Sequence, residues 1–464
     1  MRKRRRFIGI TASAATALAC SSAATAQLSG AQFGPLEEAI RAEMGAAGVP
    51  GAAVAVVSGG RVLYAKAFGV SSSETGTPVS TDMLFRIGPL TRVFTSAAML
   101  VLEQEGRIDV NAPVRECLVS LPRELLRITP HQLLTETAGF RAIDFAPGSR
   151  DERAIAYTLA GVSEKDLFTA PGTVYSQSAL GYAVAAGLIE VAAGEPFADI
   201  VRSRVLDPIG MHSSTFRTAT AITRPFALGH TSGTGSTPAV VRPFPENTVF
   251  APAELMFSSV DDLAKFAIAF MNGGQIKGRN ALSPRVIAQL SGRYAPVPSN
   301  GRNVAYGYGL IARTHRGVRL LEQAGSTPGF TAALRMAPDH QFAVIILANR
   351  DGAGFDRTLE TAMELLLPVN GVATSTSSSR RLTAIDWQQL PGKYRNGDTT
   401  LQIIADSSGL ALVQNGSRRH LEKVDDIRFA LASSEAQAEL AVVRAPGGRV
   451  AYLHALGRAY ARVH

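Results

Sequence analysis

Strand-like segments stand at the two ends of the first 370 residues, and mainly helical segments separate them. Two apolar runs, 52–57 and 62–65, flank a Gly-Gly pair that favours a hairpin turn. Three further apolar runs follow late in the chain: 318–322, 331–336 and 342–347. Strands that enclose a helical middle predict an α+β body in which the first and last strands share one antiparallel sheet.

A helix that is apolar on all sides is predicted at the start of this helical middle. Apolar residues recur at helical spacing from Leu90 to Val101, and Gly106 stands where a C-terminal cap is expected. A helix of this kind belongs in the centre of a domain. An amphipathic helix is also predicted nearer the N-terminus, between Leu36 and Met44.

A Ser/Thr run at 374–379 has no side chain suited to a hydrophobic core, which is typical of a linker. Beyond it, four short strands separated by turn residues are predicted at 401–404, 410–413, 440–443 and 450–453. We therefore expect four parts: a signal peptide at 1–26, an α+β domain at 30–370, a Ser/Thr-rich linker at 371–385 and a small β-barrel-like domain at 386–464.

The first 26 residues have the pattern of an export signal. A basic start at 2–6 leads into a short apolar stretch that ends at Ala24-Thr25-Ala26, a small-x-small cleavage pattern. The run 4–8 also resembles a twin-arginine signal, whereas lipid attachment through Cys20 is the alternative. Because the apolar stretch is too short to span a bilayer, we expect a periplasmic or secreted protein without a transmembrane segment.

Charge and cysteine content exclude several classes of partner. Removal of the signal, which carries five basic and no acidic residues, lowers the formal net charge from +9 to +4, so no nucleic-acid partner is indicated. Only Cys117 remains after cleavage, which excludes an intramolecular disulfide, and it is expected to be buried. The histidines are scattered, so neither a metal site nor a cofactor is predicted.

Several separate phrases in the first domain carry a resemblance to a known family. They are Phe-Arg-Ile-Gly at 85–88, 128–135, Pro-Gly-Thr at 171–173 with Gly-Tyr at 181–182, 208–211, 257–263 and 325–330. Together they resemble the serine β-lactamase-related family of class C β-lactamases, D-alanyl-D-alanine carboxypeptidases and esterases. The segment from Trp387 to Tyr394 is similar to the lipocalin-like domain often appended to such proteins. The resemblance implies a β-lactamase and penicillin-binding-protein fold.

The catalytic signature of that family is Ser-x-x-Lys at the start of the central helix, where lysine can deprotonate serine. Here the corresponding positions are Pro89 and Arg92. Proline has no hydroxyl and no backbone N–H for an oxyanion hole, and a guanidinium does not act as a base in proteins. Proline is, however, well suited to the first position of a helix, so the fold can tolerate it.

The other two family motifs are also substituted. The Tyr-x-Asn position falls on Gln177 and Ala179, and the Lys-Thr-Gly or His-x-Gly position begins at Gln323. Tyr175 lies two residues before the expected tyrosine and could replace it, or it could serve only in packing. The residues left to form a polar pocket are Glu136, Ser178, Gly325 and Ser326.

Three functions remain open from the sequence. The first is a catalytically silent protein, a pseudoenzyme, that binds a peptide, a cell-envelope fragment or a small anionic ligand, or that acts as a scaffold. The second is an enzyme of another type in which Arg92 and Glu136 act on an anionic substrate, although the same two residues could form a structural salt bridge. The third is residual hydrolysis by an unidentified nucleophile, because no Ser-x-x-Lys occurs anywhere in the chain. The sequence does not indicate an oligomeric state.

Overall fold

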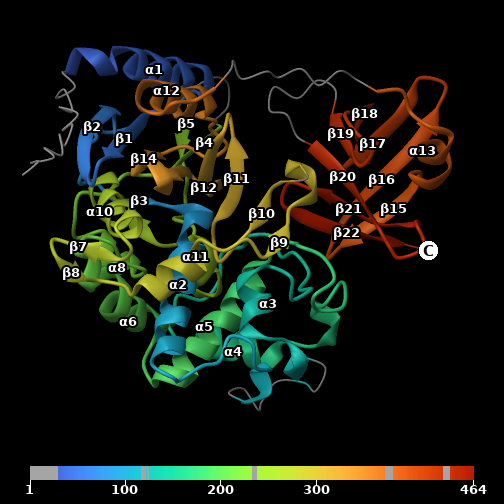
Figure 1. Cartoon of the computed structure of the whole chain (residues 1–464), viewed down its shortest axis with the longest axis horizontal. Helices are drawn as coiled ribbons and strands as arrows, with labels where there is room; N and C mark the ends of the chain where they lie inside the picture. The colour runs from blue at the N-terminus through green and yellow to red at the C-terminus, as the bar shows by residue number, and fades with distance from the viewer. Residues whose placement is uncertain are drawn as a thin grey trace, which may run out of the picture.

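A computed structural model of the chain describes residues 30–116, 122, 125–232, 238–301, 303–370, 380–431 and 439–463 (Figure 1). The predicted signal peptide, Cys20, Cys117 and the Ser/Thr run at 374–379 lie outside the described residues. Among the helices that are described, none is both long and apolar enough to cross a membrane.

The first and last strands of the main body pair within one antiparallel sheet, as predicted. Strand β1 (Gly51–Ser58) lies between β2 (Arg61–Gly69) and β14 (Phe342–Ala348). The sheet continues, in spatial order, through β13 (Phe330–Ala337), β12 (Val318–Thr327), β11 (Ile311–His315), β10 (Ala305–Tyr306) and β9 (Ala295–Pro296). The predicted trio at the end of the domain is therefore β12, β13 and β14, with the turn Pro338–His340 between the last two.

Helices cover both faces of this sheet. On one face α1 (Gly34–Ala47) and α12 (Asp356–Leu366) pack side by side, because their apolar stripes meet alternate residues of the central strands (Figure 1). On the other face lie α10 (Val260–Met271) and the helical part of the body. The two faces therefore bury two separate hydrophobic clusters.

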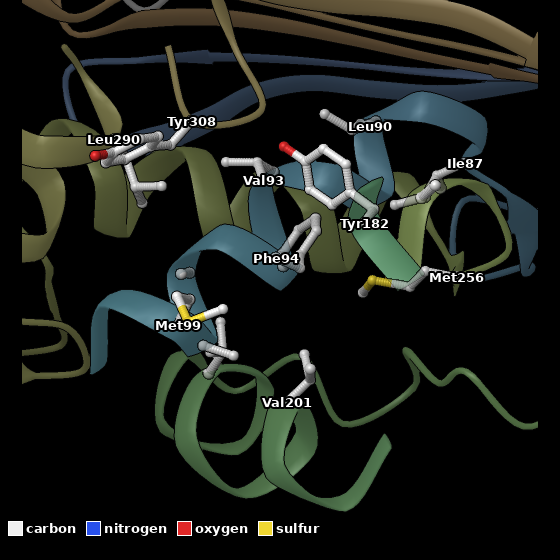
Figure 2. Close-up of a cluster of buried hydrophobic side chains, with 14 of the residues drawn as sticks. Ile87, Leu90, Val93, Phe94, Met99, Tyr182, Val201, Met256, Leu290 and Tyr308 are labelled. Carbon is white, nitrogen blue, oxygen red and sulfur yellow. The ribbon is translucent and has the colours of Figure 1, made fainter. Parts of the chain in front are cut away.

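The predicted apolar helix is α2 (Thr91–Gln104), and it runs through the centre of the larger cluster. Figure 2 shows Val93, Phe94 and Met99 of this helix among side chains from surrounding elements. The helices and short helical segments around it are η3 (Val114–Glu116), η4 (Leu125–Arg127), α3 (Pro130–Leu134), α4 (Ala154–Gly161), η5 (Glu164–Asp166), α5 (Ala179–Ala193), α6 (Phe197–Val201), η6 (Arg202–Leu206), α7 (Asp207–Ile209), α8 (Thr218–Ala221), η7 (Thr248–Phe250), α9 (Ala251–Glu254) and α11 (Pro284–Leu290).

Short elements connect these larger ones. They are η1 (Gly30–Phe33), β3 (Phe85–Arg86), η2 (Gly88–Leu90), β4 (His230–Ser232), β5 (Pro238–Val240), β6 (Phe257–Ser258), β7 (Gln275–Ile276), β8 (Arg279–Asn280), η8 (Pro298–Asn300) and η9 (Pro338–His340). Of these, β3 and η2 matter most for the site, because they carry the chain from the sheet into α2.

The C-terminal region forms a closed eight-stranded barrel beside the main body (Figure 1). After α13 (Ala384–Gln389), its strands are β15 (Gly392–Asn396), β16 (Thr399–Asp406), β17 (Gly409–Gln414), β18 (Ser417–Lys423), β19 (Arg428–Leu431), β20 (Glu439–Arg444), β21 (Val450–Ala455) and β22 (Arg458–Val463). Strand β15 pairs with β22 and closes the barrel. The four predicted strands fall within β16, β17, β20 and β21, which confirms the small β-barrel-like domain.

Candidate functional site

The segment that leads into α2 packs against strand β12. A Cβ atom built on Gly325 would lie 2.8 Å from Cγ of Pro89, so the proline ring sits directly on the glycine. The side-chain amide of Gln323 lies 3.5 Å from the carbonyl oxygen of Pro89, which accepts its hydrogen bond. The structure thus brings together Pro89 and Gln323, the residues predicted to replace the first and third family motifs.

Backbone geometry explains why proline is tolerated here. Pro89 stands in the first turn of η2, where a helical N–H has no partner within the helix. Gly88 before it has φ +53°, a left-handed conformation that glycine adopts without strain. The chain can therefore enter α2 with proline at this position and lose no backbone hydrogen bond.

Arg92, the residue predicted to replace the family's lysine, is buried between two carboxylates. Its Nη1 atom lies 3.2 Å from Oε1 of Glu136, and its Nη2 atom lies 3.5 Å from Oε1 of Glu254. The side chains of Arg92 and Glu136 are 2% and 1% exposed. The guanidinium carbon also lies 5.6 Å from the ring centroid of Tyr182. Glu254 was not anticipated from the sequence, because nothing in its local pattern distinguishes it from a surface residue.

Burial sets the protonation behaviour of this cluster. Burial raises the pKa of Glu136 to about 7, although Arg92 and the backbone N–H of Ser178 act in the opposite direction. Burial also raises the pKa of Glu254. Burial alone would lower the pKa of Arg92, but Glu136 raises it above the usual range. Arg92 therefore stays charged and cannot accept a proton from a nucleophile.

Glu136 also holds the second motif in place. Its backbone has φ +59°, and its Oε2 atom accepts a hydrogen bond from the N–H of Ser178 at 2.8 Å. The carbonyl oxygen of Glu136 accepts a further bond from the N–H of Ser176 at 2.8 Å. Two members of the predicted polar pocket, Glu136 and Ser178, are therefore in direct contact, and Ala179 follows as the first, buried residue of α5.

The barrel covers the second motif. The N–H of Gln177 donates to the carbonyl oxygen of Gly457, in the turn between β21 and β22, at 2.9 Å. The side-chain amide of Gln177 donates to the hydroxyl of Tyr175 at 3.0 Å. His454 of β21 lies 5.6 Å from the ring of Tyr175, and its Nδ1 atom is 3.0 Å from the hydroxyl of Ser299. The sequence did not indicate this contact, in which Gln177 meets a residue 280 positions further along the chain.

A buried asparagine strengthens the same contact. The side chain of Asn396 accepts a hydrogen bond from the N–H of Ala142 at 2.7 Å and donates to the carbonyl oxygen of Ala459 at 2.7 Å. It also donates to the hydroxyl of Ser176 at 3.3 Å. These bonds satisfy polar groups that the contact buries, so body and barrel meet through a specific interface.

Thr91, Ser176, Ser178 and Ser326, the hydroxyl residues next to the substituted motifs in the sequence, have structural partners. Ser178 caps α5, Ser176 accepts from the N–H of Ala459, and Thr91 accepts from the N–H of Met256. Ser326 accepts from the N–H of Gly352, and its side chain alternates with Gly325 and so lies on the face of the sheet away from Pro89. None of these hydrogen bonds, within the described part of the chain, involves a lysine or histidine that could activate a nucleophile.

A cavity of about 470 Å³ lies beside the third motif. Strand β11 pairs with β12 only as far as Glu322, so the next residues of β12 have β13 as their strand partner. The cavity is lined there by Gln323, Ala324, Arg313, Arg335, Leu456 and Gly457. The barrel turn therefore forms one wall of a space whose opposite wall is the body. No cluster of three potential metal ligands occurs in the described ranges.

Comparison with known proteins identifies the family. The family model named Beta-lactamase matches residues 36–367. Unguisins hydrolase ungD of Aspergillus violaceofuscus is 24% identical over 331 residues, which cover 65% of this chain and 58% of that protein. The chain therefore spans about three fifths of the length of that relative. Penicillin-binding protein 4 of Amycolatopsis lactamdurans is 26% identical over 310 residues, covering 65% of this chain and 81% of that protein.

Solved structures share the architecture. The crystal structure of SurE superposes with a TM-score of 0.75 at 24% sequence identity, covering 93% of this chain and 98% of that chain. This likeness of fold extends beyond the segment that the family model matches. The chain belongs to the β-lactamase family over residues 36–367, as its motifs indicated, and adds a C-terminal barrel that fits the lipocalin-like expectation.

Proposed function

We propose that this protein is an exported member of the β-lactamase family that has lost serine hydrolase chemistry and works by binding. The observation that carries the proposal is the position of Pro89, whose ring packs on Gly325 where the family requires a hydroxyl nucleophile. The ligand is a peptide, a cell-envelope fragment or another small anionic molecule, and the cavity beside β12 is its site.

The nucleophile, one oxyanion-hole donor and the base that acyl transfer needs are each missing. Pro89 cannot attack a carbonyl carbon, and it has no N–H to donate to an oxyanion. Loss of one oxyanion-hole donor typically costs about 2.7–4 kcal/mol of transition-state stabilisation. Arg92 remains charged between Glu136 and Glu254, so it does not supply a base. The proposal therefore does not depend on any single substitution.

The contacts of Glu136 favour a structural role over catalysis of another type. A general base must reach a proton of the substrate, yet Glu136 is 1% exposed and already contacts Arg92 and the N–H of Ser178. Structural ion pairs shift pKa values without taking part in a reaction. We therefore assign Arg92 and Glu136 to the support of the second motif.

Acylation of the mature protein tests the loss of chemistry. The protein is incubated with a fluorescent penicillin and with a fluorophosphonate, and its intact mass is measured beside that of a Pro89→Ser, Arg92→Lys double variant. We expect no adduct on the natural protein. A stoichiometric adduct would overturn the proposal, and peptide mapping would then identify the nucleophile. The double variant shows whether restoring two groups is sufficient for acylation.

Export is part of the same proposal and has its own test. The pattern at residues 1–26 supports a cleaved signal, with the periplasm or the exterior as its destination. N-terminal sequencing of the protein recovered from a periplasmic fraction is expected to begin at Gln27. Recovery of the protein from the cytoplasmic fraction with residues 1–26 still attached would contradict the assignment of an export signal.

A further inference from the structure

A second cavity lies in the helical part of the body and shares no lining residue with the cavity beside β12. Its volume is about 440 Å³, within the range of small-molecule sites. Elements α4, α6, α8 and α9 surround it. The apolar part of its lining includes Ile155, Phe197, Ala198, Phe216, Ala251 and Leu255.

One buried cation lines this apolar space. Arg86 of β3 is 1% exposed, and its guanidinium carbon lies 4.3 Å from the ring centroid of Phe244 and 5.1 Å from that of Phe257. Its Nη1 atom donates to the carbonyl oxygen of Pro245, whereas its Nε atom has no hydrogen-bond partner among the described residues. A buried donor without a partner is costly, and it therefore points to a missing acceptor.

The carboxylates around the cavity already have other partners. Glu246 pairs with Arg150 at 2.7 Å, and Glu152 pairs with Arg217. Glu190 accepts a hydrogen bond from the N–H of Phe197 at 2.9 Å, and burial raises its pKa. Glu246 forms its ion pair with Arg150, although its charge also raises the pKa of Arg86 against the effect of burial. Burial lowers the pKa of Arg86 to about 10, so it is still charged at neutral pH.

We propose that this cavity binds a small monocarboxylate with an alkyl chain, such as a medium-chain fatty acid. The carboxylate would accept a hydrogen bond from the Nε atom of Arg86 and neutralise its charge. The alkyl chain of the ligand would lie against Phe197, Phe216 and Leu255. It would cover apolar side chains that line the cavity, which is favourable because apolar surface is removed from water. This site is separate from the one assigned to the proposed function and does not depend on it.

Titration calorimetry with decanoate below its micelle concentration tests the site on the mature protein. We expect saturable binding of one decanoate per chain, with weaker binding of decanol and decylamine, because Arg86 favours an anion. Arg86→Met should weaken decanoate binding by about tenfold while leaving decanol binding unchanged. Equal affinities for decanoate and decanol, or the absence of saturable binding, would overturn the proposal.

A second variant keeps the test decisive if Arg86→Met does not fold. Ala198 is a half-buried residue of the lining, and Ala198→Phe should fill the cavity and abolish decanoate binding. The matched control is Ala156→Phe, on the exposed side of α4 and outside the lining, which should bind as the natural protein does. Undiminished binding by Ala198→Phe would place the ligand elsewhere. The Pro89→Ser, Arg92→Lys variant should retain binding, which separates this site from acylation.

Discussion

Arg92, which the sequence predicts at the family's lysine position, lies in a charged cluster inside the body. It contacts the buried carboxylate of Glu136, the partly exposed carboxylate of Glu254 and an aromatic ring, so its removal leaves Glu136 without its cation in the protein interior. We expect Arg92→Met to lower the free energy of unfolding by about 3–5 kcal/mol, because Glu136 then loses its buried partner. Urea denaturation, followed by tryptophan fluorescence or circular dichroism, measures the change.

Two further variants separate the ion pair from other effects of the substitution. The double variant Arg92→Met, Glu136→Leu should be less destabilised than Arg92→Met alone, because it removes one of the uncompensated charges. Arg217→Met, which breaks the less buried ion pairs with Asp199 and Glu152, should cost less than Arg92→Met. Equal losses for Arg92→Met and Arg217→Met would show that the buried cluster is not important for stability.

At the scale of elements, the contact between η2 and β12 depends on the absence of a side chain at Gly325. A Cβ atom there would come within 2.8 Å of the ring of Pro89. We expect Gly325→Ala to lower the free energy of unfolding by about 1–3 kcal/mol, as overpacking of an interior does. Adding Pro89→Ala should recover part of the loss, and chemical denaturation of the single and double variants measures the coupling. Additive losses would mean that the two residues do not touch.

The order of the elements followed from patterns that are local in sequence. Strands β1 and β14 are continuous apolar runs buried on both faces, and α2 is apolar on all sides, so these elements were predictable. The short strands β9 and β10 were not predicted, because two residues carry no periodicity. The same limit applies to η2, whose conformation depends on its packing against β12.

At the scale of the whole molecule, the interface between body and barrel includes a histidine that acid should affect. Burial lowers the pKa of His454 to about 3, whereas an unfolded histidine titrates near 6.5. Between these two values the unfolded chain binds more protons than the folded chain, so stability falls as the pH falls from 6.5 towards 3. Thermal midpoints measured across this range should fall less steeply for His454→Gln than for the natural protein.

A matched control distinguishes this histidine from general acid denaturation. His212 has a side chain that is 71% exposed, and His212→Gln removes an imidazole that lies outside the interface. We expect its thermal midpoints to follow those of the natural protein across the pH range. If the two histidine variants behave alike, protonation of His454 does not contribute to the acid response.

The sequence alone determined the family, the α+β body and the barrel-like C-terminal region, because each depends on residue type or local periodicity. Only the tertiary structure decided that Pro89 rests on Gly325, that Glu254 joins Arg92 and Glu136, and that the barrel covers Gln177. The cavity beside Arg86 was equally out of reach of the sequence. The physical reason is that these contacts join residues far apart in the chain, and no local pattern records which distant side chain fills a given space.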